Sequence, residues 1–137
     1  MIHFTIQVLE DGWAVIEVEL NNQKMEITFE YTPNDGLYEL IYSALELSRK
    51  AESVIEFPHH PDMSTILIIE PFEDDQVRIK LSDIIDYVSI VQYYRAILRM
   101  FDKYLYEHSK EEYETTWRRS FPENEWKYLR ALYRASK

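Results

Sequence analysis

Hydrophobic residues recur at every second position through residues 2–31, which is the period of a β-strand with one buried face. The repeat is interrupted at 11–12 (Asp-Gly) and 21–22 (Asn-Asn), pairs that are typical of tight turns between antiparallel strands. We therefore predict a three-stranded meander with one hydrophobic and one polar face. The predicted inward-facing residues of the first strand are Ile2, Phe4, Ile6 and Val8. The polar face carries Glu17, Glu19, Glu26, Glu30, Thr5 and Thr28.

A helix and three further strands are predicted to follow the meander. Thr32 and Pro33 favour a helix start, with Thr32 as the N-cap, and hydrophobic residues then recur at helical spacing to about residue 50. Strands are predicted at 53–57, 65–70 and 76–81, the last two joined by an acidic turn. The four consecutive hydrophobic residues that begin at Ile66 do not alternate, which favours a strand buried on both faces.

The longest helical pattern covers residues 84–108, which contain neither glycine nor proline. Its hydrophobic side chains cover an arc of roughly 180°, wider than the ~100° that one contact surface needs. We therefore expect a sheet on one side of this helix and another helix on the other side. Ser82 or Asp83 is the expected N-cap. Ser109 predicts the start of a second helix, and residues 120–123 predict the start of a third.

Together these elements predict a single α+β domain over residues 1–137. Its antiparallel sheet would have about six strands, in the order of a three-stranded meander, a helix and three further strands. The long central helix and the C-terminal helices would cover one face of this sheet. A chain of 137 residues is long enough to bury such a core without disulfides or a structural metal.

The charge of the chain is strongly negative and unevenly distributed. The net charge is −10, and residues 1–87 hold 18 acidic and 5 basic side chains, against 7 acidic and 10 basic in residues 88–137. An acidic surface repels phosphate backbones and anionic lipids, so we expect no nucleic acid partner and no membrane partner, and we suspect a basic protein partner. The simpler alternative is that the charge only keeps the protein in solution.

Composition excludes several classes of site. The chain has no cysteine and two glycines, Gly12 and Gly36, so it offers neither a thiolate nor the glycine-rich loop of a phosphate or dinucleotide site. It shows no secretory signal and no hydrophobic run near the ~20 residues of a membrane span, and we expect a cytoplasmic location. We find no catalytic motif and expect no catalytic residue, no cofactor and no bound metal.

The leading hypothesis is a small acidic cytosolic protein-binding module without catalytic activity. One concrete form is an immunity or inhibitor protein that covers a basic bacterial toxin, a class that this chain resembles in size and charge only. The predicted partner-binding residues are Glu17, Glu19, Glu26, Glu30, Thr5 and Thr28.

Two alternatives come from other functional classes. A small metal-dependent hydrolase would use the His59-His60 loop with nearby carboxylates, because imidazole and carboxylate groups are common zinc ligands. A self-associating structural subunit would instead form a homo-oligomer through aromatic side chains. The aromatic residues proposed for that contact are Trp117, Phe121 and Trp126.

Overall fold

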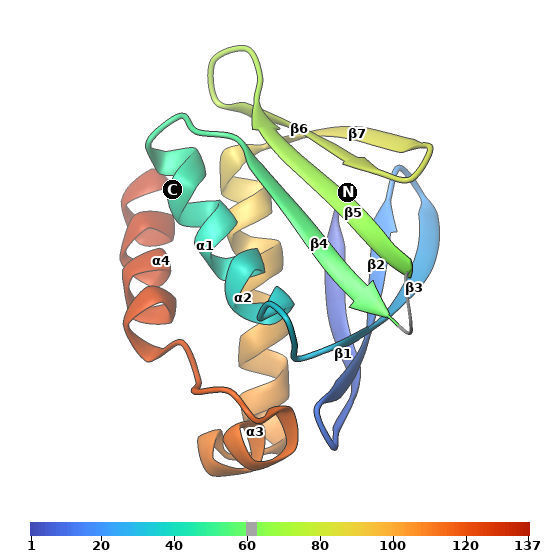
Figure 1. Cartoon of the computed structure of the whole chain (residues 1–137). Helices are drawn as coiled ribbons and strands as arrows, with labels where there is room; N and C mark the ends of the chain where they lie inside the picture. The colour runs from blue at the N-terminus through green and yellow to red at the C-terminus, as the bar shows by residue number, and fades with distance from the viewer. Residues whose placement is uncertain (60–62) are drawn as a thin grey trace.

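The computed structural model describes residues 1–59 and 63–137. In chain order its elements are β1 (His3–Glu10), β2 (Trp13–Leu20), β3 (Gln23–Glu30), α1 (Gly36–Ser48), β4 (Ser53–His59), β5 (Met63–Pro71), β6 (Gln76–Leu81), β7 (Ile84–Ser89), α2 (Ile90–Glu107), α3 (Lys110–Trp117) and α4 (Glu123–Ser136). The strands form two antiparallel sheets, one with the order β1-β2-β3 and one with the order β4-β5-β6-β7. Helices α1 and α2 lie against the sheets, α4 packs on α1 and α2, and α3 lies near the β1–β2 turn (Figure 1).

The predicted α+β class is confirmed, whereas the prediction of one six-stranded sheet is wrong in detail, because the strands divide between a three-stranded and a four-stranded sheet. The chain passes through α1 between β3 and β4, and these two strands meet through side chains instead of a hydrogen-bonded ladder. Phe29 and Phe57 are in edge contact, with ring centroids 4.7 Å apart. Gly36 begins α1 against these rings, where a Cβ would come within 2.9 Å of Phe57.

The seventh strand, β7, occupies residues that were predicted as the first turns of the central helix. Leu81 pairs with Ile84, so β6 and β7 form a two-residue hairpin in which Ser82 has a φ of 57°. The helix begins at Ile90 because Ser89 caps it. The Ser89 hydroxyl accepts a hydrogen bond from the Gln92 backbone N–H at 3.1 Å, and the Gln92 side chain accepts one from the Ser89 N–H at 2.9 Å. The prediction of Ser82 or Asp83 as the N-cap is therefore wrong.

Helix α2 nevertheless forms the predicted centre of the core. Tyr93, Ile97 and Phe101 are fully buried on one side, and Arg95 and Arg99 are exposed on the other. Contacts with β1 on one flank and with α1 and α4 on the other explain why its hydrophobic arc is so wide. Among the described residues, none of the helices combines the length and hydrophobicity needed to cross a membrane.

Asp35, not Thr32, is the N-cap of α1, and it also ties this helix to α3. Its Oδ1 accepts hydrogen bonds from the Tyr38 backbone N–H at 3.0 Å and from the Trp117 indole N–H at 2.9 Å. Burial raises the pKa of the Asp35 carboxyl above its usual value, against the lowering effect of the Tyr38 and Trp117 hydrogen bonds. The half-buried Asp35 carboxylate thus joins two elements that lie far apart in the sequence.

Helix α3 also holds the turn between β1 and β2. The Gly12 backbone N–H donates to the Thr116 carbonyl at 2.7 Å, and the Gly12 carbonyl accepts from the Tyr31 N–H at 2.9 Å. Gly12 has a φ of 78°, and a Cβ there would lie 2.6 Å from the Tyr31 ring, so both the backbone and the space require glycine. Arg119, just after α3, donates two hydrogen bonds to the Tyr31 carbonyl.

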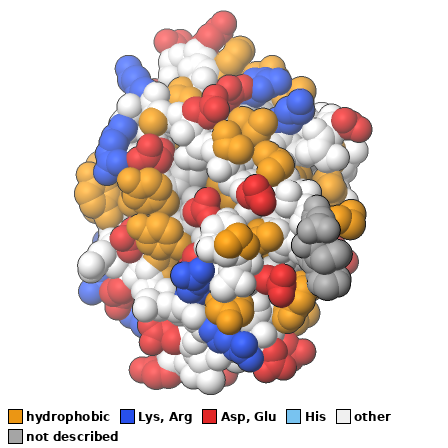
Figure 2. Space-filling view, viewed as in Figure 1, with side chains coloured by type: hydrophobic (Ala, Val, Ile, Leu, Met, Phe, Trp, Pro, Cys, Tyr) orange, Lys and Arg blue, Asp and Glu red, His pale blue; other side chains and the backbone are white. Residues whose placement is uncertain are grey.

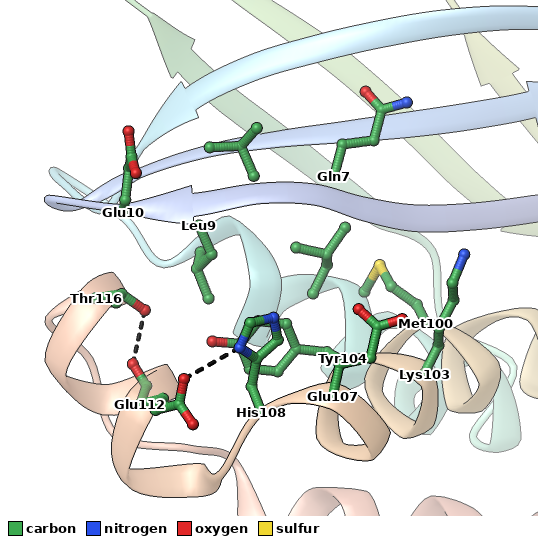
Figure 3. Close-up of a pocket in the computed structure, with 12 residues that line it drawn as sticks. Gln7, Leu9, Glu10, Met100, Lys103, Tyr104, Glu107, His108, Glu112 and Thr116 are labelled. Carbon is green, nitrogen blue, oxygen red and sulfur yellow. Dashed lines mark hydrogen bonds and ion pairs between the residues drawn. The ribbon is translucent and has the colours of Figure 1, made fainter.

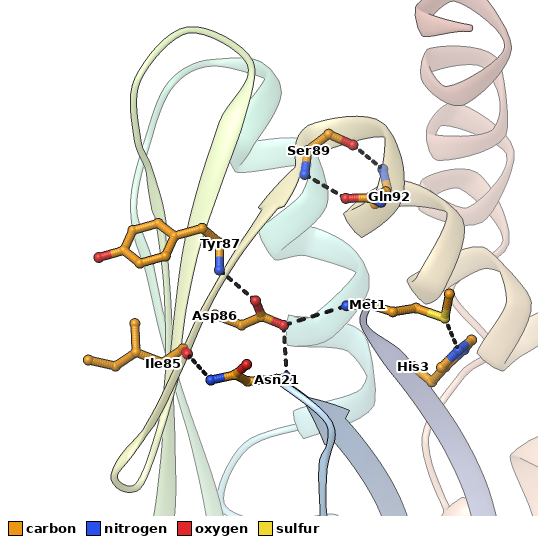
Figure 4. A network of polar contacts seen from close by, with 8 residues as sticks. All are labelled: Met1, His3, Asn21, Ile85, Asp86, Tyr87, Ser89 and Gln92. Atoms are coloured by element: carbon orange, nitrogen blue, oxygen red, sulfur yellow. Dashed lines mark hydrogen bonds and ion pairs between the residues drawn. The ribbon is translucent and has the colours of Figure 1, made fainter.

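A polar contact at the opposite end of the strands joins the two sheets. Asp86 on β7 accepts hydrogen bonds from the Asn21 N–H in the β2–β3 turn at 2.9 Å and from the Tyr87 N–H at 2.8 Å (Figure 4). The α-amino group of Met1 lies 3.9 Å from the same carboxylate. The two sheets are therefore fixed to each other at this end by a charged side chain, and elsewhere by the shared core.

Candidate functional site

The polar face of the three-stranded sheet is the site that the sequence predicted, and the strand register shows how its residues are arranged. Its side chains are exposed or half-buried, while the alternate side chains of β2 are buried. Thr5 lies opposite Glu17, and Glu17 lies opposite Glu26, so these three form one row across the sheet. We call the whole set the acidic sheet face, which comprises Thr5, Glu17, Glu19, Glu26, Thr28 and Glu30.

The remaining residues of the acidic sheet face lie in separate rows. Glu19 lies between His3 and Lys24, and the Lys24 ammonium group partly offsets its charge. Thr28 lies opposite Val15. Glu30 lies opposite Trp13 at the far end of β3, away from the other glutamates. The structure thus brings together Thr5, Glu17 and Glu26 and leaves the other three predicted residues around them.

The Glu17–Glu26 pair is the least favourable contact of this face. Residues directly opposite on antiparallel strands have Cβ atoms ~5 Å apart, and like charges at that position destabilise a sheet. The Gln7 amide donates a hydrogen bond to Glu17 at 3.3 Å. Within the described residues, none of the four glutamates of the acidic sheet face forms an ion pair. The folded chain therefore keeps two opposed carboxylates uncompensated on its surface.

A bulge in β1 turns Val8 toward the outer side of the three-stranded sheet. The register shifts between Ile6 and Val8, so that Val8 pairs with Val15 on the outer side and is 42% exposed. The prediction of Val8 as an inward-facing residue is wrong, and Leu9 packs against the core instead. The bulge places Gln7 at the rim, between the acidic sheet face and the neighbouring cavity.

That cavity lies between β1, the end of α2 and α3 and has a volume of about 370 Å³ (Figure 3). His108 Nδ1 lies 3.1 Å from a Glu112 carboxylate oxygen, and the His108 ring stacks on Tyr104 with centroids 4.5 Å apart. The hydrogen bond with His108 lowers the pKa of the Glu112 carboxyl. Glu10 and Glu107 add further carboxylates to the lining.

The chemistry of this cavity favours recognition over catalysis. The Thr116 hydroxyl, which lines it, already donates to the Glu112 carbonyl at 2.7 Å and is not positioned by His108 as a nucleophile. Three carboxylates against one lysine, Lys103, suit a cationic side chain that enters from outside. Sequence analysis missed this site because its residues come from three separate elements, and the helix-end position of His108 was its one local signal.

A second exposed surface, on the four-stranded sheet, was also missed. Residues 66–69 alternate after all, with Leu67 and Ile69 buried while Ile66 is 38% exposed, so the prediction of a strand buried on both faces is wrong. Figure 2 shows hydrophobic side chains gathered over β4 and β5, with charged side chains around them. We call this surface the hydrophobic sheet face, which comprises Val54, Ile66, Ile68, Phe72, Ile85 and Tyr87.

The residues of the two alternative hypotheses lie as follows. His59 Nε2 is 3.3 Å from the Thr65 hydroxyl, and His60 lies outside the described residues. In residues 1–59 and 63–137, no three His, Cys, Asp or Glu side chains are grouped so that they could hold a metal ion. Trp117 is fully buried, Phe121 is 7% exposed and Trp126 is half-buried against the core, so Trp126 is the most accessible of the three aromatic residues proposed for self-association.

No family model, curated protein or solved structure matches this chain. The function has to be inferred from the geometry and charge of these surfaces.

Proposed function

We propose that this chain is a non-catalytic protein-binding module whose acidic sheet face captures a basic protein. The observation that supports this function is the row in which Glu17 directly opposes Glu26 on an uncovered face. An opposed pair of this kind costs folding stability, whereas a solvated sheet surface is equally served by threonine or by alternating charges. A basic partner would remove the repulsion when it binds.

The neighbouring cavity supports the same function. Gln7 lines the cavity and also donates to Glu17, so the two acidic surfaces are continuous across β1. A flat charged face steers a partner and raises its association rate, and a cavity beside it gives one lysine or arginine side chain a defined place. The concrete form that we propose is an inhibitor or immunity-type protein, in which the acidic surface covers a basic partner.

The decisive experiment neutralises the acidic sheet face without changing its shape. The variant carries Glu17→Gln, Glu19→Gln, Glu26→Gln and Glu30→Gln. The matched control removes four acidic charges from exposed positions elsewhere, with Glu73→Gln, Asp74→Asn, Asp83→Asn and Glu111→Gln. Both variants have the same net charge, so a difference between them reports the position of the charges and not their number.

Proteins captured from the native cell lysate at low and high salt are identified by mass, and the association rate of each is then measured with purified components. We expect a basic protein to be captured by the wild type and by the control. The acidic-face variant should associate about tenfold more slowly at low salt, a difference that shrinks as salt screens the charges. Equal capture by both variants would refute the proposal.

A further inference from the structure

The hydrophobic sheet face places apolar side chains where an exposed sheet face is normally polar. Val54 lies opposite Ile68, Ile68 opposite Lys80, and Lys80 opposite Ile85, so one row with three hydrophobic residues crosses all four strands. Val54 is 55% exposed and Tyr87, at the next row, is 50% exposed. A sheet that faces water on one side alternates hydrophobic and polar residues, and contiguous exposed apolar side chains mark contact surfaces.

The charged residues of this face are balanced, unlike those of the rest of the molecule. Glu56 on β4 and Glu70 on β5 supply the acids, and Arg78 and Lys80 on β6 supply the bases. Glu70 and Arg78 form an ion pair, while in the described part of the chain neither Glu56 nor Lys80 has an ionic partner. A strongly basic partner would find no net attraction here, although the chain carries a net charge of −10.

The distribution of these charges fits a second copy of the same chain. The acids lie on the β4–β5 half of the face and the bases on the β6–β7 half. A two-fold axis that runs along the strands between β5 and β6 lays the acidic half of each copy on the basic half of the other. Two sheets stacked in this way keep their strands nearly aligned, which is the common packing of β-sandwiches. We infer that the hydrophobic sheet face is a two-fold interface between two copies of this chain.

The size of the face predicts a weak dimer. Four strands ~4.8 Å apart and about seven residues long give a flat footprint of roughly 400 Å² per copy, before side-chain relief adds to it. Two such footprints total roughly 800 Å², below the ~1,000 Å² of specific interfaces, so side-chain relief has to supply the remainder. We therefore expect a dissociation constant on the order of 10 μM.

The experiment measures mass against concentration by sedimentation equilibrium. The wild type should pass from 16.6 kDa to twice that mass. Val54→Asp should raise the dissociation constant at least about tenfold, because the two-fold axis lays Val54 of one copy over Ile85 of the other and the added charge loses its water on association. Val15→Asp is the matched control, since Val15 also lies on an outer sheet face, and it should change the constant by less than about twofold. Ile85→Asp, on the other side of the same contact, serves if Val54→Asp does not fold.

A charge exchange tests whether the charge balance of this face supports the dimer. Lys80→Glu alone leaves the face with three acids and one base and should weaken the dimer about tenfold. Adding Glu56→Lys to the same chain restores the balance and should recover most of the affinity. A wild type that stays at 16.6 kDa up to ~1 mM would overturn the inference, because another molecule must then cover this face. Equal dissociation constants for Val54→Asp and Val15→Asp would overturn it as well.

Salt should change the affinity of this interface and the affinity of the acidic sheet face in opposite directions. Two copies with the same net charge of −10 repel each other at long range, so moderate salt should tighten the dimer by screening that repulsion. The same salt should weaken capture of a basic protein by the acidic sheet face. If salt weakens both associations in parallel, the dimer forms through charged surfaces and not through the hydrophobic sheet face.

Discussion

Removing the Asp35 side chain tests whether α1 and α3 depend on a shared acceptor. Asp35→Ala loses the N-cap of α1, which costs about 1 kcal/mol. It also leaves the Trp117 indole N–H, in a fully buried ring, without its acceptor, which costs about 1–3 kcal/mol. We expect a total loss of about 2–4 kcal/mol, a large part of the ~5–15 kcal/mol that stabilises a domain. The midpoint of thermal unfolding should fall by roughly 10 °C.

Asp35→Asn separates the hydrogen bonds from the charge. The amide oxygen can accept both hydrogen bonds, so the free energy of unfolding of this variant should be within about 1 kcal/mol of that of the wild type at neutral pH. The raised pKa of Asp35 means that the folded chain binds a proton on this carboxyl more tightly than the unfolded chain, in which the pKa is near 3.8. The wild type therefore loses stability as pH rises from about 3.8 through the folded pKa, and Asp35→Asn should lack that loss.

Urea unfolding, followed by tryptophan fluorescence and circular dichroism at several pH values, measures both effects. Trp117→Phe completes a double-mutant cycle with Asp35→Ala, and we expect a coupling of about 1–2 kcal/mol. A free energy of unfolding for Asp35→Ala within ~0.5 kcal/mol of the wild type would contradict the role of Asp35 as a shared acceptor, and so would an Asp35→Asn variant as destabilised as Asp35→Ala. Either result would mean that Trp117 is held by packing alone.

Three further outcomes follow from burial and charge. Ile97→Asp should prevent folding because an unpaired buried charge costs several kcal/mol, whereas Arg99→Asp should leave the chain folded. Similar thermal midpoints for the two variants would contradict the buried and exposed sides assigned to α2. Replacing both His59 and His60 with alanine should change stability by less than about 1 kcal/mol, and a metal lost with these side chains would favour the hydrolase hypothesis. The variant that neutralises the acidic sheet face should be about 0.5–1 kcal/mol more stable than the wild type and unfold at a slightly higher temperature, because glutamine removes the repulsion between β2 and β3. An unchanged thermal midpoint would show that solvent already screens the Glu17–Glu26 pair.

Local patterns predicted the first three strands and the face on which Glu17 and Glu26 lie. Alternation and the two-residue turns are properties of neighbouring residues, so tertiary contacts were not needed to find them. The boundary between β7 and α2 was missed because neither glycine nor proline interrupts residues 84–108. At 100° per residue Ile84, Ile85 and Val88 lie outside the hydrophobic arc of the helix, which was a signal that the helix begins later. The pair Ser89 and Gln92 was a further signal for the helix start, since it has the spacing of a capping box.

The division into two sheets, the cavity and the hydrophobic sheet face could not be predicted in the same way. Each depends on which distant strands pair and which elements pack together, and sequence periodicity carries no such information. The run of hydrophobic residues from Ile66 was consistent with burial on both faces, and only the position of β5 in the sheet shows that Ile66 faces outward. The bulge that turns Val8 outward likewise does not interrupt the alternation of hydrophobic and polar residues in the sequence of β1.

The hydrogen bond from Gly12 to Thr116 has a consequence for the order in which the chain can fold. The tip of the first hairpin is synthesised early, yet its carbonyl partner lies in α3, near the other end of the sequence. Closing such a long loop is entropically costly and makes the final step non-local. On the ribosome, the first two strands would emerge with their turn unfastened and stay so until α3 leaves the exit tunnel. Closure of this hairpin turn therefore waits for α3, and a chain from which α3 has not yet emerged would present an unsecured hairpin to chaperones and proteases.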